Sequence, residues 1–185
     1  MLAFDIETTG LDGKTCRVTA ACIYGAQVSE TYLFKDQDPE ADLLQRERFM
    51  LALDAAPRLC SFNGIRFDIP FLHSAWRIPD RRIESWALKT FDVYEACKLA
   101  LNSTFSLDRL LSKNHLESKT GSGLHAIHLA STGQWDALGD YCMQDTRMTY
   151  LVSSQPTIRL PVALRGRAEC ALVDDPYRPF VEGLI

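Results

Sequence analysis

An apolar segment carrying two acidic side chains opens the chain, and it constrains the fold more than any other feature. It runs from Leu2 to Gly10 and reads LAFDIETTG. Side chains alternate between the two faces of a strand, so Asp5 and Glu7 point to one face and their apolar neighbours to the other. Like charges about 4 Å apart repel by roughly 4 kcal/mol at an effective dielectric of about 20. A divalent cation removes that repulsion, and Mg²⁺ or Mn²⁺ prefers oxygen ligands. An Asp-x-Glu pair alone is also typical of a solvated strand end.

The composition favours a globular protein inside the cell. The chain has 185 residues, of which 46% are hydrophobic and 24% charged, which fits one domain or one domain with a tail. No apolar run approaches the roughly 20 residues that span a bilayer, and the N-terminus lacks the pattern of a signal peptide. We therefore expect an intracellular protein, in the cytoplasm or in a nucleus, without a membrane partner.

Charge restricts how the protein can handle nucleic acid. The formal net charge is −4, which argues against binding nucleic acid by bulk electrostatics alone. It does not exclude a nucleic-acid enzyme, because acids gathered in one site are neutralised by metal. The six cysteines are scattered and form no CxxC pair, which indicates reduced thiols and neither a disulfide framework nor a zinc site.

Hydrophobic spacing along the chain predicts an α/β or α+β domain. After the opening strand we expect strands over 15–24, 29–34, 58–62 and 86–91, with a polar connector over 79–82. Helices are expected over 39–56, 66–76, 92–101, 106–111, from about 124, and over 135–151. Beyond residue 153 the chain becomes irregular and proline-rich. We therefore predict a domain over 1–153 and a C-terminal extension over 154–185, packed on the domain or used for a partner.

Three further side chains bear on the opening acids. Asp68 stands at the start of a predicted helix, and Tyr141 and Asp145 lie four residues apart on the last one, so both face the same way. Together with Asp5 and Glu7, these acids supply four carboxylates that can hold two divalent ions for an in-line displacement at phosphorus. Tyr141 is placed one helical turn away to hydrogen-bond the attacking water.

These residues fall into three motifs that resemble the DEDD superfamily of 3′–5′ exonucleases. The motifs are FDIETTGL at 4–11, FNGIRFDIPFL at 62–72 and YCMQD at 141–145. The last is the Tyr-x-x-x-Asp pattern of the tyrosine (DEDDy) branch, because the histidine branch needs His at position 140, where this chain has Asp140. The set is similar to the proofreading domains of family B DNA polymerases and their stand-alone relatives.

The resemblance implies a fold, an activity and a set of roles. The fold is ribonuclease H-like α/β, a central mixed sheet flanked by helices. The activity is metal-dependent 3′–5′ hydrolysis of single-stranded nucleic acid ends to nucleoside monophosphates. Tyr141 would position the attacking water, and Glu7 would also lie near the substrate 3′ hydroxyl. The ligands of two Mg²⁺ or Mn²⁺ ions would be Asp5, Glu7, Asp68 and Asp145.

Substrate contacts are also implied by the resemblance. Relatives contact the terminal nucleotides at the positions of Thr8, Leu11, Phe62 and Asn63, although simple packing explains Leu11 and Phe62 equally well. Two more acids, Asp92 and Asp108, occupy recurring acidic positions. We interpret both as structural or helix-start residues, because Asp near a helix N-terminus is stabilising.

Two other patterns are set aside. His125-x-x-His128 has no accompanying ligands that would complete a metal site. The stretch KTGSG at 119–123 lacks the pattern of a phosphate-binding loop and is either a loop near the nucleic acid or a plain connector.

Several alternatives stay open. The expected partners are single-stranded DNA or RNA 3′ ends, and a replication or repair protein bound through the C-terminal extension. An exoribonuclease that trims RNA fits as well, since no motif reports contacts to the 2′-OH. A catalytically silent binding module of the same fold would be marked by lost carboxylates, and all four are present. No polymerase domain is expected on this chain, so proofreading would need a separate partner.

Overall fold

A mixed sheet forms the centre of the molecule. The computed structural model describes residues 1–101, 104–117 and 123–161. The five strands follow the spatial order β3-β2-β1-β4-β5. β1 pairs antiparallel with β2, which pairs antiparallel with β3, whereas β1–β4 and β4–β5 are parallel. The predicted mixed sheet is therefore confirmed. The strands are β1 (Leu2–Thr8), β2 (Val18–Gly25), β3 (Val28–Leu33), β4 (Leu59–Ser61) and β5 (Thr90–Asp92).

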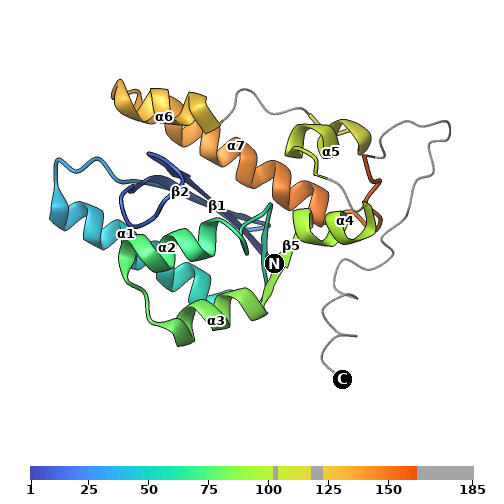
Figure 1. Cartoon of the computed structure of the whole chain (residues 1–185), viewed down its shortest axis with the longest axis horizontal. Helices are drawn as coiled ribbons and strands as arrows, with labels where there is room; N and C mark the ends of the chain where they lie inside the picture. The colour runs from blue at the N-terminus through green and yellow to red at the C-terminus, as the bar shows by residue number, and fades with distance from the viewer. Residues whose placement is uncertain (102–103, 118–122, 162–185) are drawn as a thin grey trace.

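Helices cover both faces of this sheet. Figure 1 shows α1, α2 and α3 on one side of the strands and α5, α6 and α7 on the other. None of the helices in the described part of the chain is long and apolar enough to cross a membrane. The helices are α1 (Pro39–Ala55), α2 (Asp68–Trp76), α3 (Asp80–Leu88), α4 (Val93–Leu101), α5 (Leu107–Lys113), α6 (Gly123–Ser131) and α7 (Trp135–Ser153).

Two helix starts follow directly from their capping residues. The Asp38 carboxylate accepts a hydrogen bond from the Ala41 amide at 3.0 Å, with Pro39 as the first residue of α1. The Ser106 hydroxyl accepts one from the Arg109 amide at the start of α5. Such caps satisfy amides that have no partner within the helix.

Apolar packing on both faces of β1 holds the layers together. Phe4 and Ile6 are buried on the side of α1 and α2, with Phe49, Leu53 and Trp86 among their neighbours in the core. On the opposite side α7 crosses β1, β2 and β3. Gly139 permits this close crossing, because a Cβ atom there would lie 3.1 Å from Thr31 Cγ2 on β3. The glycine thus sets how near the helix lies to the sheet.

One predicted segment is wrong. Residues 80–88 form α3, where we expected a polar connector over 79–82 and a strand over 86–91; β5 comprises only Thr90–Asp92. A short apolar run fits a buried strand and a helix face equally well. The helix prevails because it places Arg82 and Trp86 one turn apart, so that both side chains reach Asp54 on α1.

Element boundaries differ more modestly. β2 begins at Val18, three residues later than 15, because Asp12 turns the preceding segment: its Oδ1 accepts the Lys14 amide at 3.0 Å and its carbonyl the Cys16 amide at 2.8 Å. The helix expected near 124 is α6, which begins at Gly123. The remainder of the predicted 119–123 loop lies outside the described residues.

The first residues of the predicted C-terminal extension pack on the domain. Ile158 and Leu160 are 0% and 2% exposed and join the core beside α7. Asn114 and Arg159 exchange two hydrogen bonds: the Asn114 amide donates to the Arg159 carbonyl at 2.9 Å, and the Arg159 amide donates to Asn114 Oδ1 at 2.8 Å. Residues 162–185 lie outside the described residues, so the division at 153/154 stays a prediction.

Candidate active site

A cavity of about 380 Å³ opens between β1, the end of β4, and helices α2, α5, α6 and α7. All five residues predicted to be catalytic line it, although they come from three distant parts of the chain. These are Asp5, Glu7, Asp68, Tyr141 and Asp145. The sequence-based grouping of these side chains around one space therefore matches where the structure places them.

β1 pairs with β4 only over the first part of its length, and the cavity lies beyond the end of that pairing. The parallel ladder between them ends at Ala3 and Cys60. Further along β1, the Ile6 amide donates a hydrogen bond to Asp68 Oδ1 at 3.0 Å. A carboxylate at the start of α2 thus takes the place of a backbone acceptor. This contact fixes Asp68 against β1, between the positions of Asp5 and Glu7.

Asp68 lies in an environment that disfavours its charge. It is 3% exposed. Burial, with a smaller contribution from the charge of Asp92, raises its pKa to about 7, against the opposing effect of the Ile6 amide. Without a cation nearby, the Asp68 carboxyl therefore holds its proton up to near neutral pH. A cation in the cavity would favour the ionised form.

Helix α7 supplies the opposite wall. Tyr141 and Asp145 are 5% and 7% exposed and sit one turn apart on the face that lines the cavity. Between them in sequence, Cys142 turns toward β1, with its Sγ 3.7 Å from the Asp5 carbonyl oxygen and 4.0 Å from Asp5 Oδ2. Ligand atoms of Asp5, Glu7 and Cys142 all lie within 4.8 Å of one another.

The donor set fits a hard divalent cation. Four carboxylates line one cavity, and carboxylate oxygens are the ligands that Mg²⁺ and Mn²⁺ prefer. Cys142 is a poor thiolate donor, because burial, together with its hydrogen bond to Cys22, raises the pKa of its thiol well above the ordinary value. The chemistry therefore favours an oxygen-bound metal over a soft one.

Asp92 shapes the turn that carries Phe62 and Asn63. Its carboxylate is 2% exposed and accepts hydrogen bonds from the amides of Asn63 and Ile65, each at 2.9 Å. It also accepts the Glu95 amide at 3.1 Å, which caps the start of α4. Asn63 adopts a left-handed backbone conformation with φ of 68°, which asparagine tolerates well. This geometry fits the structural role predicted for Asp92.

The predicted substrate-contact residues divide into two pairs. Phe62 and Asn63 line the cavity. Thr8 and Leu11 are not among its lining residues: the Thr8 hydroxyl donates to the Gly10 carbonyl at 2.6 Å, and Leu11 is 87% exposed. A register shift between Glu7 and Thr8 marks where β1 becomes irregular. Their proposed contacts with substrate stay predictions.

Asp108, the other acid interpreted as structural, lies in the first turn of α5 and does not line the cavity. That position suits a carboxylate near a helix N-terminus.

Sequence reasoning missed a residue next to Tyr141. The His125 ring on α6 meets the Tyr141 ring edge-on, with centroids 5.8 Å apart and planes at 73°. The His125-x-x-His128 pair lacks the further ligands of a metal site, so the sequence pattern does not single out His125. The contact depends on the packing of α6 on α7, and no local sequence motif predicts it. Ser106 and Leu107, also missed, line the cavity from the start of α5.

Comparisons with known proteins agree with this architecture. The chain is similar to the family B DNA polymerase from the hyperthermophilic archaeon Pyrobaculum calidifontis, with a TM-score of 0.62 and 17% identity. The match covers 80% of this chain but only 23% of the polymerase. At this identity the likeness shows the fold alone. No curated protein matches the sequence.

The model of the RNase_H superfamily matches residues 2–154, which include every described strand and helix. The same range contains the four carboxylates and Tyr141. The match supports a nuclease-type function. This chain belongs to the RNase H superfamily.

Proposed function

We propose that this protein is a metal-dependent 3′–5′ exonuclease of the DEDDy type, which hydrolyses single-stranded nucleic acid ends to nucleoside monophosphates. The observation that carries the proposal is the convergence of four carboxylates and one tyrosine on a single cavity. Residues as distant in sequence as Asp5 and Asp145 line this cavity.

The carboxylates would hold two divalent ions. Bound Mg²⁺ or Mn²⁺ stabilises charge on the attacking and leaving oxygens of an in-line displacement at phosphorus. Asp5 and Glu7 present oxygens from one face of β1, and Asp145 faces them from α7. Asp68 is fixed by the Ile6 amide, and a bound cation would favour its ionised form. All four acids thus favour cation binding, which relieves their mutual repulsion.

Tyr141 would orient the attacking water. Its ring is 5% exposed and bounded by the His125 ring, so its position in the cavity is restricted. In the reaction a water oxygen forms a bond to phosphorus, the bond from phosphorus to the 3′ oxygen of the preceding nucleotide breaks, and that oxygen takes up a proton. Restricting the water through the tyrosine hydroxyl contributes to rate without binding substrate.

The test uses matched DNA and RNA oligonucleotides labelled at the 5′ or 3′ end, incubated with Mg²⁺ or Mn²⁺. We expect stepwise shortening of 5′-labelled strands, slower digestion when the 3′ end carries a phosphate, and no reaction in excess EDTA. The RNA arm decides between deoxyribonuclease and exoribonuclease activity. Cleavage of circular single strands would reveal an endonuclease, and full activity in EDTA would contradict metal dependence.

A further inference from the structure

The central sheet has two edges, and only one of them is protected against pairing with another strand. β5 forms one edge and has only three residues, whereas β3 forms the other and has six, Val28–Leu33. Proteins keep an edge from pairing by making it short or by placing proline, lysine or a bulge in it. β3 reads VSETYL and pairs with β2 without a register shift, so it carries none of these features. Among the described residues, none pairs with its outer side.

Every second residue of β3 points its backbone groups away from the sheet. The Phe34 amide donates to the Thr19 carbonyl at 3.0 Å, and the bonded pairs of an antiparallel ladder recur at every second residue. The even-numbered residues of β3 therefore bond to β2. The outward-facing residues are Ser29, Thr31 and Leu33, of which the first two are exposed. The Leu33 carbonyl accepts a hydrogen bond from the Gln45 side chain at 3.4 Å, which agrees with this pattern.

These outward groups are complementary to the same groups of a second copy of the chain. If two β3 edges run antiparallel with Thr31 at the two-fold axis, Thr31 faces its own copy and Ser29 faces Leu33 of the second copy. All three outward residues then have a facing residue, and each such pair exchanges two hydrogen bonds. A two-fold contact uses the same surface on both subunits, and this arrangement meets that condition.

Charge is complementary around the same axis. Arg48 Nη2 on α1 lies 3.3 Å from Glu30 Oε2, and these side chains are 60% and 40% exposed. In the arrangement centred on Thr31, Glu30 faces Tyr32 of the second copy, so no two carboxylates face each other directly. A guanidinium group has five N–H donors, so the exposed part of Arg48 can also bond Glu30 of the second copy. Two arginines and two glutamates then alternate around the axis.

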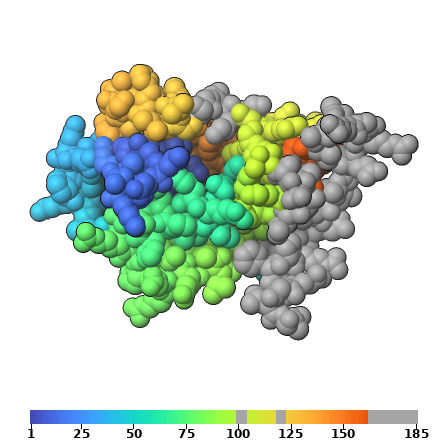
Figure 2. Space-filling view, viewed as in Figure 1, coloured from blue at the N-terminus to red at the C-terminus, as the bar shows by residue number. Residues whose placement is uncertain are grey.

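This edge lies away from the candidate active site. β2 separates β3 from β1, which carries Asp5 and Glu7, and no residue of β3 lines the cavity. In Figure 2 the light-blue residues around α1 and the yellow-green residues of α4 and α5 lie toward opposite ends of the molecule. Pairing through β3 therefore leaves the cavity open.

We propose that this chain forms a two-fold dimer in which the β3 edges of two copies pair antiparallel around Thr31. The two sheets then become one continuous sheet. α1 and α7 both contact β3, so their borders join the interface. A contact of one strand and two helix borders belongs at the small end of protein interfaces, at about 1,200 Å² in total, so we expect a micromolar dissociation constant. The dimer does not depend on the exonuclease function and is tested without it.

Sedimentation velocity of the full-length chain over a range of micromolar concentrations measures self-association. Thr31→Pro is the main variant, because proline is tolerated on an edge strand where its nitrogen faces outward. It removes both central hydrogen bonds of the dimer but none of the bonds between β3 and β2. We expect the dissociation constant to rise by about 5- to 100-fold. Thr31→Val, which keeps the amide and the branched shape, should dimerise as wild type does.

Cross-linking tests the register without a proline substitution. Facing residues of a hydrogen-bonded pair have Cα atoms about 5.5 Å apart, a distance that a disulfide spans. An equimolar mixture of Ser29→Cys and Leu33→Cys should therefore form disulfide-linked dimers under mild oxidation. Ser29→Cys mixed with wild type is the matched control, because Ser29 and its own copy lie roughly 13 Å apart along the paired strands. Melting temperatures show which variants are folded.

Wild type that stays monomeric at every concentration would overturn the proposal and leave the edge to a segment of another protein. A folded Thr31→Pro variant that dimerises as tightly as wild type would overturn it too. If Thr31→Pro does not fold, the cross-link decides. Equal yields of linked dimer from the mixture of Ser29→Cys with Leu33→Cys and from its control would exclude this interface.

Discussion

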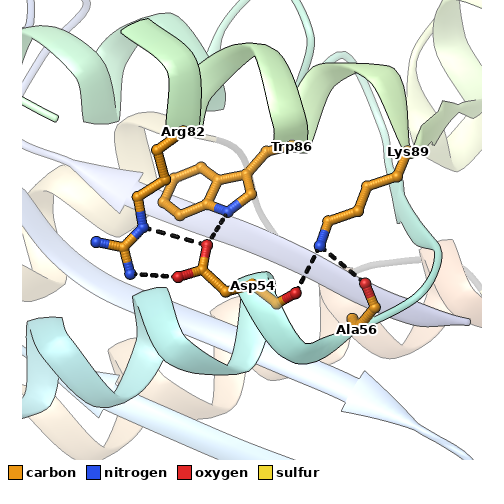
Figure 3. Close-up of polar contacts among 5 residues, drawn as sticks. All are labelled: Asp54, Ala56, Arg82, Trp86 and Lys89. Carbon is orange, nitrogen blue, oxygen red and sulfur yellow. Dashed lines mark hydrogen bonds and ion pairs between the residues drawn. The ribbon is translucent and has the colours of Figure 1, made fainter. Parts of the chain in front are cut away.

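Two regions of this molecule are built around acidic side chains, one exposed and the other buried, and they compensate the carboxylate charge in opposite ways. In the first, Asp54 at the end of α1 accepts hydrogen bonds from Arg82 Nε at 3.1 Å and Nη2 at 2.6 Å, and from Trp86 Nε1 at 2.7 Å (Figure 3). Lys89 adds bonds of 2.8 Å to the Asp54 and Ala56 carbonyls. We call these contacts the Asp54 network.

The second region is the acidic end of the sheet, represented by Asp68 and Asp92. Both carboxylates are almost fully buried and accept hydrogen bonds from backbone amides, and Asp92 also from Ser61 at 3.4 Å. Neither forms an ion pair among the residues that the structure describes. Burial raises the pKa of both, whereas the Arg82 and Trp86 hydrogen bonds overcome burial and lower the pKa of Asp54.

The two regions differ in the positive charge that lies beside the carboxylate, and this difference indicates their roles. The Asp54 network carries its own cations, so it is complete and ties α3 to α1. Both carboxyls at the acidic end of the sheet are held in place by amides that supply no full positive charge, and Asp68, which lines the cavity, can be neutralised by an added cation. Perturbed carboxyls in a cavity mark functional sites for this reason.

The largest expected effect is the loss of activity in Asp5→Asn, at the acidic end of the sheet. Asp5→Asn removes one charged ligand, and we expect the single-turnover rate to fall by more than about 10³-fold, beyond the usual loss for one electrostatic stabiliser. Metal affinity in calorimetric titration should fall as well. The matched control is Asp140→Asn, an exposed acid on α7 that does not line the cavity. Equal rates for the two variants would separate Asp5 from the chemistry.

A smaller loss is expected for Tyr141→Phe. This change keeps the buried ring and its contact with His125 but removes the hydroxyl. Removing a group that positions a nucleophile lowers rates by about 10²–10⁴-fold, and we expect the lower end of that range. Metal titration and melting temperature should match wild type. A wild-type rate would make Tyr141 a packing residue and end the DEDDy assignment.

The motif pattern could be predicted from sequence because it depends on local rules. Strand alternation put Asp5 and Glu7 on one face, and helical periodicity did the same for Tyr141 and Asp145. Contacts between separate helices and strands have no local sequence pattern that predicts them. The meeting of His125 with Tyr141 depends on how α6 packs on α7, and the register shift between Glu7 and Thr8 depends on how β1 pairs with β2.

The Asp54 network shows the same limit in the fold. Its members lie up to 35 residues apart, so the sequence around Trp86 could be assigned to a strand with equal local support. What decides for α3 is a carboxylate on another helix.

A third prediction tests the acidic end through pH. In EDTA, the raised pKa of Asp68 means that its contribution to wild-type stability is fully present below the ordinary aspartate pKa of about 4 and is lost as pH rises to about 7. Asp68→Asn keeps an oxygen for the Ile6 amide but never ionises. The melting temperature of Asp68→Asn should therefore exceed that of wild type by a few degrees at pH 7 and by little at pH 4. Added Mg²⁺ should raise the melting temperature of wild type more than that of Asp68→Asn.

The smallest effect is expected for Asp54→Asn, and its pH dependence should have the opposite sign. A lowered pKa contributes stability that is present above the ordinary value and lost as pH falls through the folded value. The Asp54 side chain is 39% exposed, so we expect only about 1 kcal/mol of destabilisation at pH 7, shrinking below about pH 4. Urea unfolding at several pH values measures it.

The control for that change is Asp80→Asn, which removes an ion pair with His73 at 3.0 Å whose aspartate is 83% exposed. Because exposed pairs contribute little, we expect a change within about 0.5 kcal/mol at any pH. If the stability effects of Asp54→Asn and Asp68→Asn changed with pH in the same direction, the proposed contrast between the two acids would be wrong. That contrast is between a carboxylate neutralised by its own arginine and one that has no cation of its own. If the stability changes of the two variants instead have opposite slopes against pH, and that of Asp80→Asn does not depend on pH, the difference arises from those local charges.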